Sequence, residues 1–445
     1  MGDTNTVFMY SIGVPNVFPL QTLFVDFNAY FASVEQQTRP ELRGRAVGVV
    51  PVLAEGTCCI AASYEAKAFG IKTGTSIREA RERCPGIVIV EARPPLYVEF
   101  HQRAVALVDT VAPVKQVMSI DEMECELTGR WRERERALGL ALRIKSVLAT
   151  QLGECMKVSI GIAPNTFLGK LASDLHKPDG LTVIEHGDIP HRLLDVPLSA
   201  YHGIGPRMLR RLQRHGITNT EQLYAAPREV LHTVWGGVVG SEMYDKLRGQ
   251  PYEPRHSPPR SLGHSHVLPP ELRTPAGALG VLNRLMQKAA MRLRKQQLYA
   301  KALSVHVRAH GPYDRDLSMR LQADEYARFH ETQDTVFLLR TLDALWQRGP
   351  HRIARPKTVG LVLHELVPAA MHTASLFDAP VQTTASPQPA RQPQRQAPEK
   401  LYEALDQLNL KYGKNTLYFA NSHTTKDRAP MRIAFNRIPD VRTES

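Results

Sequence analysis

The sequence predicts an α+β protein built from several domains. At 445 residues the chain is too long for a single compact core, and a length of roughly 100–200 residues per domain suggests three or four units. The first 180 residues alternate short apolar runs with helical patterns, whereas short helices and turns follow Gly180. A segment rich in Pro, Gln and Ala after Asp378 cannot bury enough apolar surface to order and predicts a linker.

The first 180 residues predict a mixed sheet that carries helices. The opening run TLFVD (22–26) is short and apolar and ends in an acid, as expected of a buried strand that delivers a side chain to its open end. The next residues, NAYFASVEQQ, suit a helix. Further strands are predicted at VGVV (47–50), CCIAAS, IVIVEA (87–92), VMSIDEMECEL (117–127) and VSIGIA, with helices at YEAKAFG and over 131–151.

The second half of the chain predicts smaller modules. Gly203 and Gly205 lie between two helical patterns, which fits a helix-hairpin-helix whose tight turn approaches a DNA phosphate, or else a plain αα-turn. Strand patterns at ALSVHVRA (302–309) and TVGLVLHEL (358–366) flank helical stretches and predict a small α+β module. In the tail, Leu401, Leu405 and Leu408 share one helical face, and TLYFA (416–420) resembles a strand.

The charge of the chain favours a polyanionic partner. The formal net charge is +12, and residues 251–370 alone carry 18 Lys and Arg against 10 Asp and Glu. Such an excess suits nucleic acid, although basic proteins also bind other partners. No apolar run approaches the roughly 20 residues that span a bilayer, so no membrane association is expected. The five cysteines form no C-x-x-C pair, which predicts reduced thiols in a cytoplasmic protein.

Three acidic residues suggest metal-dependent phosphoryl chemistry. Asp26 ends the first predicted strand, and Asp121 and Glu122 are adjacent within MSIDEMECEL. Because neighbouring strand residues point to opposite faces, Asp121 and Glu122 can converge only at a bent strand end or hairpin tip. Carboxylate oxygens are the ligands that two Mg²⁺ ions about 3.5–4 Å apart require in nucleotidyl transfer. The period-two acids Glu124 and Glu126 predict a solvated face instead.

Five sequence blocks follow one another along the chain: VDFNAYFASVE, SYEAKAFGIKTG, MSIDE, SIGIAPNTFLGKLASDLHKPDG and HGIGPRMLRRL. In order and spacing they resemble those of Y-family DNA polymerases. The similarity covers roughly residues 20–370 and extends to both DinB-like (DNA polymerase IV) and UmuC-like members. It implies a right-hand polymerase with a palm, small fingers, a helix-hairpin-helix thumb and a little-finger domain.

The resemblance also implies domain boundaries. These are an N-terminal extension (1–20), the palm in two parts (21–30 and 91–181), the fingers (31–90), the thumb (182–250), a tether (251–260), the little finger (261–368), a linker (369–400) and a UmuC-like C-terminal segment (401–445).

Site residues follow from the matching positions. Asp26, Asp121, Glu122 and the carbonyl of Phe27 fall on the metal ligands for two Mg²⁺ per active site. Phe31 falls on the steric gate that excludes a ribose 2′-hydroxyl, with Tyr30 beside it, although without the motif it would suit a core aromatic. Asn28 stands where DinB-like members often have Asp and is not counted as a ligand. Positions implied to bind the triphosphate are Tyr64, Lys67 and Lys177, and those implied to bind DNA are Gly203, Gly205, Arg207, Arg210 and Arg211.

The implied partners are primer-template DNA and dNTP. TASLFD (373–378) resembles a sliding-clamp-binding peptide anchored by Leu376 and Phe377, although Thr373 replaces the usual Gln. LDQLNLKYGKNTLYFA and the later APMRIAFNRIP resemble the C-terminal segment of UmuC-like proteins, so a UmuD-like accessory subunit is a candidate partner.

The expected activity is low-fidelity, distributive DNA synthesis with bypass of damaged template bases. Two alternatives stay open. A repair scaffold without catalysis would resemble inactive Y-family relatives, but it would be expected to lack the three carboxylates. A nucleotidyl cyclase also places paired acids on a palm-like sheet, but the basic C-terminal half and the thumb pattern argue against it.

Overall fold

The computed structural model describes residues 18–54, 57–253, 258–309, 322–372, 398–413, 416–420 and 423. The chain divides into two compact units, one formed by Met1–Ser33 and Phe100–Pro254 and the other by Val34–Glu99 and Arg255–Ser445. No described helix is long and apolar enough to cross a bilayer.

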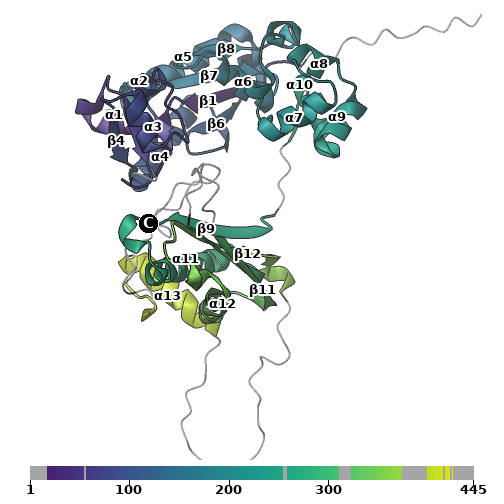
Figure 1. The fold of residues 1–445 in the computed structure, drawn as a ribbon. Coiled ribbons are helices and arrows are strands. Elements are labelled where there is room, and N and C mark those ends of the chain that lie inside the picture. Colours follow the sequence, from purple (N-terminus) through teal and green to yellow (C-terminus); the bar gives the residue numbers. More distant parts are fainter. Residues whose placement is uncertain are drawn as a thin grey trace, which may run out of the picture. The chain divides into compact units, whose positions relative to one another are not determined.

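A five-stranded sheet is the centre of the first unit (Figure 1). Its strand order is β5-β6-β1-β7-β8, and β1 pairs antiparallel with both of its neighbours. Every residue of β1 is buried, as the apolar run TLFVD predicted. The strands are β1 (Thr22–Phe27), β5 (Val114–Val117), β6 (Glu122–Glu126), β7 (Val158–Ala163) and β8 (Leu181–Val183).

Helix α6 (Thr166–Leu175) packs very closely on this sheet. A Cβ atom added at Gly161 of β7 would lie 2.0 Å from the carbonyl oxygen of Gly169. Only glycine leaves room for this approach of two backbones. Asn165 caps the helix by accepting a hydrogen bond from the amide of Leu168. The other long helices of this part of the chain are α1 (Tyr30–Thr38), α4 (Pro94–Asp109) and α5 (Arg134–Gln151). The 3₁₀ turn η2 (Gly129–Arg132) precedes α5.

Short helices gather at the end of the first unit (Figure 1). Their apolar core includes buried Tyr201, Leu212 and Leu231 and continues onto Phe167 of α6. The turn through Gly203 and Gly205 joins a single 3₁₀ turn to α7, so a full helix is present on one side of it only. The elements are η3 (His186–Asp188), η4 (His191–Leu193), η5 (Leu198–Ala200), α7 (Pro206–Arg214), α8 (Thr220–Ala225), α9 (Arg228–Trp235) and α10 (Val238–Leu247).

Residues 34–99 of the second unit contain a small sheet with the order β3-β2-β4. Glu35 is fully buried and accepts hydrogen bonds from the guanidinium of Arg93, at 2.7 and 3.0 Å, and from the hydroxyl of Tyr97 at 2.7 Å. These bonds tie α1 to α4. The remaining elements are η1 (Pro40–Leu42), β2 (Val47–Val50), β3 (Ala61–Ala62), α2 (Tyr64–Lys67), α3 (Ile77–Arg83) and β4 (Val88–Glu91).

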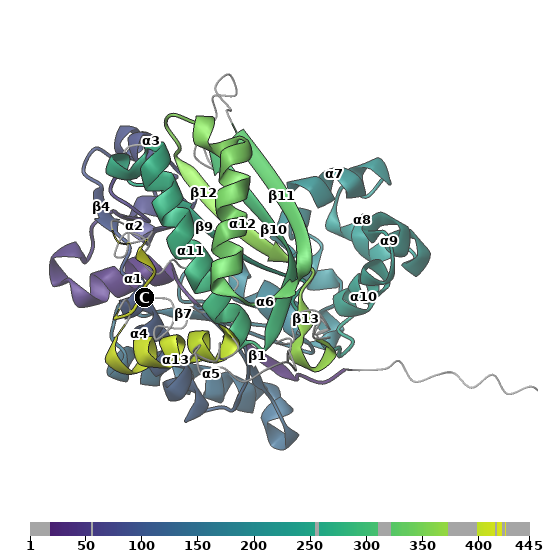
Figure 2. The same cartoon turned by 90° about the horizontal axis from the view of Figure 1, so that it is seen from below.

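Residues 258–372 of the second unit contain, in their described part, a five-stranded antiparallel sheet, in which four strands have the order β11-β10-β12-β9 and β13 also pairs with β10. Figure 2 shows α11 and α12 side by side across one face of it, and the apolar core lies between them and the strands. The elements are β9 (Ser261–Val267), η6 (Pro270–Leu272), α11 (Pro275–Lys295), β10 (Leu298–Arg308), β11 (Gln322–Thr332), α12 (Thr335–Arg348), η8 (Pro350–Arg352), β12 (Thr358–His364), β13 (Val367–Pro368) and η9 (Ala369–Met371).

Helix α13 (Pro398–Tyr412) attaches the tail to this layer. The Arg294 guanidinium of α11 makes two hydrogen bonds to the Asp406 carboxylate, at 2.7 and 3.0 Å, and the Tyr402 hydroxyl donates to Asp334 at 2.8 Å. Leu401 and Leu408, which marked the helix in the sequence, are exposed. The strand expected at TLYFA was wrong, because residues 416–419 form bends and irregular backbone. Leu376 and Phe377 lie outside the described residues.

Candidate active site

The three acidic residues singled out in the sequence lie at one end of the first unit's sheet. Asp26 is opposite Glu122 in the register of β1 and β6, and the Phe27 amide donates a 2.9 Å hydrogen bond to the carbonyl of Asp121. Asp121 lies in the turn that leads into β6, and its carboxylate accepts a 2.5 Å hydrogen bond from the Ser119 hydroxyl. Asp121 thus lies in the turn and Glu122 in the strand, so strand geometry does not force their side chains to opposite faces.

Two lysines neutralise this acidic cluster. The Lys170 ammonium contacts the Asp26 carboxylate and lies 2.8 Å from Glu122 Oε1. The Lys177 ammonium lies 2.6 Å from Asp26 Oδ1. Asp26 is only 2% exposed, so burial of its charge without a positive partner would be unfavourable. Both lysines also contact Asp174, which follows Lys170 by one helical turn.

The proton affinities of the cluster follow from burial and from these contacts. Burial raises the pKa of Asp121 to about 6; the Ser119 hydrogen bond lowers it and the charges of Asp26 and Glu122 raise it. Burial alone would lower the pKa of Lys170, but Asp26, Glu122 and Asp174 hold it above its usual range. Both ammonium groups thus stay charged at neutral pH, and the site combines fixed positive charges with carboxylates.

The donor set suits a hard divalent cation, which these carboxylate oxygens could hold with the carbonyl of Phe27. Across the described residues, no three Asp, Glu, His or Cys side chains already converge as a metal-binding group. Instead, the Lys170 ammonium takes the position of a cation between Asp26 and Glu122. The residues present therefore fit a bound cation, because Asp26 and Glu122, two predicted ligands on different strands, both reach one positive centre.

Asn28 and Glu124 have structural surroundings that the sequence did not disclose. Asn28 is buried, its amide donates to the Ser159 hydroxyl at 3.0 Å, and its Oδ1 accepts the Asp179 amide at 2.6 Å. The side chain thereby holds the loop that follows Lys177. The solvated face expected at Glu124 was wrong, since this carboxylate is buried and accepts hydrogen bonds from two threonine hydroxyls; Glu126 is exposed, as expected.

Aromatic side chains follow the acid of β1 directly. Tyr30 and Phe31, at the start of α1, are both buried. Their rings meet edge to face with centroids 5.7 Å apart, and Tyr30 packs against Phe27 in the same manner at 5.5 Å. Phe31 is therefore a buried ring that packs against an aromatic neighbour.

The other predicted nucleotide and DNA residues lie elsewhere in the chain. Tyr64 and Lys67 begin and end α2, where the Lys67 ammonium lies 4.1 Å from the centroid of the Tyr64 ring. Gly203 has a φ of +86°, which suits glycine, and Gly205 is the N-cap of α7. Arg207, Arg210 and Arg211 are exposed on that helix.

In the second unit, the face of the sheet that points away from α11 and α12 carries polar side chains. Ser304, His306 and Arg308 alternate along β10 with buried Val305 and Val307.

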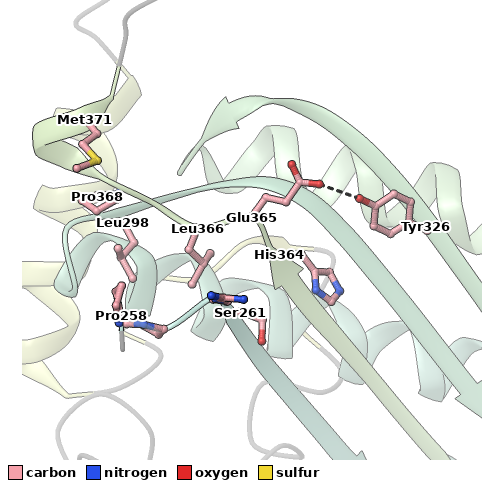
Figure 3. Close-up of a pocket in the computed structure, with 11 residues that line it drawn as sticks. Pro258, Ser261, Leu298, Tyr326, His364, Glu365, Leu366, Pro368 and Met371 are labelled. Carbon is pink, nitrogen blue, oxygen red and sulfur yellow. Dashed lines mark hydrogen bonds between the residues drawn. The ribbon is translucent and has the colours of Figure 1, made fainter. Parts of the chain in front are cut away.

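At one end of this sheet lies a cavity of about 690 Å³ between β12, β13 and the segment before β9 (Figure 3). Its wall includes Glu365, whose carboxylate accepts hydrogen bonds from the Tyr326 hydroxyl at 3.3 Å and from Arg328 at 2.6 Å. These contacts place one acid among the basic and polar groups of the sheet.

Sheet, acids and lysines together define a palm-type nucleotidyl transferase. Comparisons with known proteins narrow this class. The impB/mucB/samB family matches residues 25–174, and its C-terminal domain matches residues 259–376. The DNA polymerase IV of Moorella thermoacetica is 32% identical over 420 residues, covering 90% of this chain and 96% of that protein. The DNA polymerase IV of Bacillus velezensis is 27% identical over 422 residues, covering 93% and 95%.

Solved structures agree on the fold. A Y-family DNA polymerase chimera of Dbh and Dpo4 has a TM-score of 0.63 at 24% identity, covering 78% of this chain and 99% of its own. An insertion ternary complex of Dbh DNA polymerase has a TM-score of 0.52 with the same coverage. The chain belongs to the Y family of DNA polymerases, in the DinB-like group of DNA polymerase IV. It is a DNA-directed DNA polymerase of translesion synthesis, an activity that depends on divalent metal in this family.

Lys170 and Asp174 are the functional candidates that sequence reasoning missed. Both lie inside the block SIGIAPNTFLGKLASDLHKPDG, from which only Lys177 was selected. The spacing of Lys170, Asp174 and Lys177 by four and three residues was the available signal, because such residues share a helix face.

Proposed function

We propose that this chain extends a primer 3′-hydroxyl with dNTP by distributive, low-fidelity synthesis, using two Mg²⁺ ions. The contact of Asp26 and Glu122 with one positive centre, Lys170 Nζ, carries the proposal. Asp26, Asp121, Glu122 and the Phe27 carbonyl would hold the metal ions, whose chemistry would be to neutralise charge on the attacking oxygen and on the leaving pyrophosphate.

The surrounding residues orient the nucleotide. Lys170 and Lys177 remain charged and supply ammonium groups for anionic oxygens. For Tyr64 and Lys67 of α2, contacts to the triphosphate are proposed on the family resemblance alone. Phe31, which packs against Tyr30, is the proposed steric gate, because an aromatic ring beside the sugar would leave no volume for a ribose 2′-hydroxyl.

DNA contacts are proposed for two surfaces. Exposed Arg207 and Arg210 beside the Gly203–Gly205 turn suit backbone phosphates, and so does the polar face of β10. Contacts to backbone phosphates position DNA without reading its sequence, which suits a polymerase that accepts any template.

Primer extension with purified protein, dNTP and Mg²⁺ tests the proposal. The double substitution Asp121→Ala, Glu122→Ala should abolish product. Glu126→Ala is a matched control, because Glu126 is an exposed acid on the same strand. Full synthesis by the double variant would overturn the assignment of the metal site. Product with undamaged template only would contradict translesion synthesis.

Further partners are proposed on sequence alone. Leu376 and Phe377 would anchor the chain on a sliding clamp, and a UmuD-like subunit would bind the UmuC-like tail. Loss of clamp-stimulated synthesis on Leu376→Ala, Phe377→Ala would support the first, and co-purification through residues 401–445 the second. A cytoplasmic location fits the five free cysteines.

A further inference from the structure

One acid of the lysine cluster is neither a predicted metal ligand nor part of the sheet. Asp174 lies near the end of α6, four residues after Lys170 and three before Lys177. Its carboxylate is 3.1 Å from the Lys170 ammonium and 2.8 Å from that of Lys177. Both lysines are therefore shared between Asp174 and the acids of the sheet.

This sharing matters when a cation binds. Lys170 and Lys177 together surround Asp26, which accepts both ammonium groups. A divalent cation at Asp26 would repel both of them, so each must give up that contact. Without a second acceptor, two partly buried ammonium groups would lose their counter-charge at the same step.

Asp174 offers that acceptor without any change of helix geometry. It is farther along α6 than Lys170 and is about one-third exposed, whereas the side chain of Asp26 is 3% exposed. The lysines can stay on Asp174 while Asp26 turns to a cation, and there they remain available to an incoming anion.

We propose that Asp174 is a positioning residue that holds Lys170 and Lys177 when metal binds, which frees Asp26 and keeps both ammonium groups ready for the nucleotide triphosphate. This inference rests on the proposed function of the site. A different role, in which Asp174 only stabilises α6 through its lysine pairs, would affect unfolding and leave metal binding unchanged.

The test compares Asp174→Asn with Asp174→Glu, which differ in charge. Mn²⁺ binding to the full chain with primer-template and no nucleotide is measured by electron paramagnetic resonance of the free ion. Asp174→Asn should weaken binding about three- to tenfold, the size of effect expected for losing two partly exposed charge contacts. Asp174→Glu should restore most of it. Glu133→Gln is the control, because Glu133 also pairs with a basic residue three positions away, Arg136.

Kinetics provide the second readout. Asp174→Asn should raise the KM for dNTP and the Mg²⁺ concentration needed for half-maximal rate, and excess Mg²⁺ should restore most of kcat. Melting temperature monitors folding, and Asp174→Gln against Asp174→Glu replaces the comparison if the Asn variant does not fold.

Unchanged Mn²⁺ affinity in Asp174→Asn, or an equal defect in Asp174→Glu, would overturn the inference. A parent protein that neither binds Mn²⁺ nor extends primers would refute the proposed function itself. A parent that does both, with Asp174→Asn equal to it, would refute only the role of Asp174.

Discussion

Removal of the Asp406 carboxylate tests how the tail helix is attached to the second unit. The Arg294 side chain is 6% exposed and that of Asp406 14%, and two hydrogen bonds join them. Loss of one partner of a buried ion pair costs about 3–5 kcal/mol. Arg294 keeps the Gln333 carbonyl and the Thr335 hydroxyl as acceptors, so we reduce the expected cost for Asp406→Ala to about 2–3 kcal/mol.

This cost should appear as local opening of α13. A helix of 15 residues is marginal in water without tertiary contacts. In hydrogen exchange measured by mass spectrometry, protection over 398–412 should fall about 30- to 150-fold, at 1.36 kcal/mol per tenfold. Glu403→Ala, at an exposed position of the same helix, is the control. Equal protection in the two variants would refute the view that the Arg294 pair holds the helix in place.

Three further predictions address the gate, the packing and the pH response. Phe31→Ala should raise the ratio of ribonucleotide to deoxyribonucleotide kcat/KM by about tenfold or more in single-nucleotide insertion assays; an unchanged ratio would exclude a gate. Gly161→Ala should destabilise the first unit by about 3 kcal/mol in urea unfolding, because its Cβ meets the Gly169 carbonyl; an unaltered midpoint would contradict this packing. Burial lowers the pKa of His306, so the unfolded chain takes up a proton at a higher pH than the folded protein does. The contribution of His306 to stability should therefore be complete above about pH 6.5 and decrease below it. His306→Gln should reduce this dependence of the melting temperature on pH.

The fully buried strands were predictable because burial on both sides leaves a simple signal. The run VGVV coincides with β2, and TLFVD occupies all but the last residue of β1. Since β1 is central, its residues must be apolar except where the strand ends, and Asp26 marks that end.

The partners of polar groups were much harder to predict. The acids of β6 alternate in sequence like a solvated face, yet Glu124 is buried because Thr22 and Thr166 approach it from β1 and α6. Those contacts join residues 102 and 42 positions away, which local periodicity cannot report. The tail shows the same limit, because the leucine pattern predicted α13 but its attachment depends on Tyr402 and Asp406.

The lysines of the candidate site connect the buried strand β1, which the sequence predicted, with polar contacts that it did not predict. A buried strand that ends in an acid must find positive charge wherever the fold provides it, since an unpaired carboxylate at 2% exposure would be strongly unfavourable. Helix α6 provides it because the close approach of Gly161 to Gly169 brings the helix onto β1 and β7. The glycines in SIGIAPNTFLGK thus have a functional consequence: a bulkier residue at Gly161 would move Lys170 away from Asp26 and Glu122, and with it the charge balance on which cation binding depends.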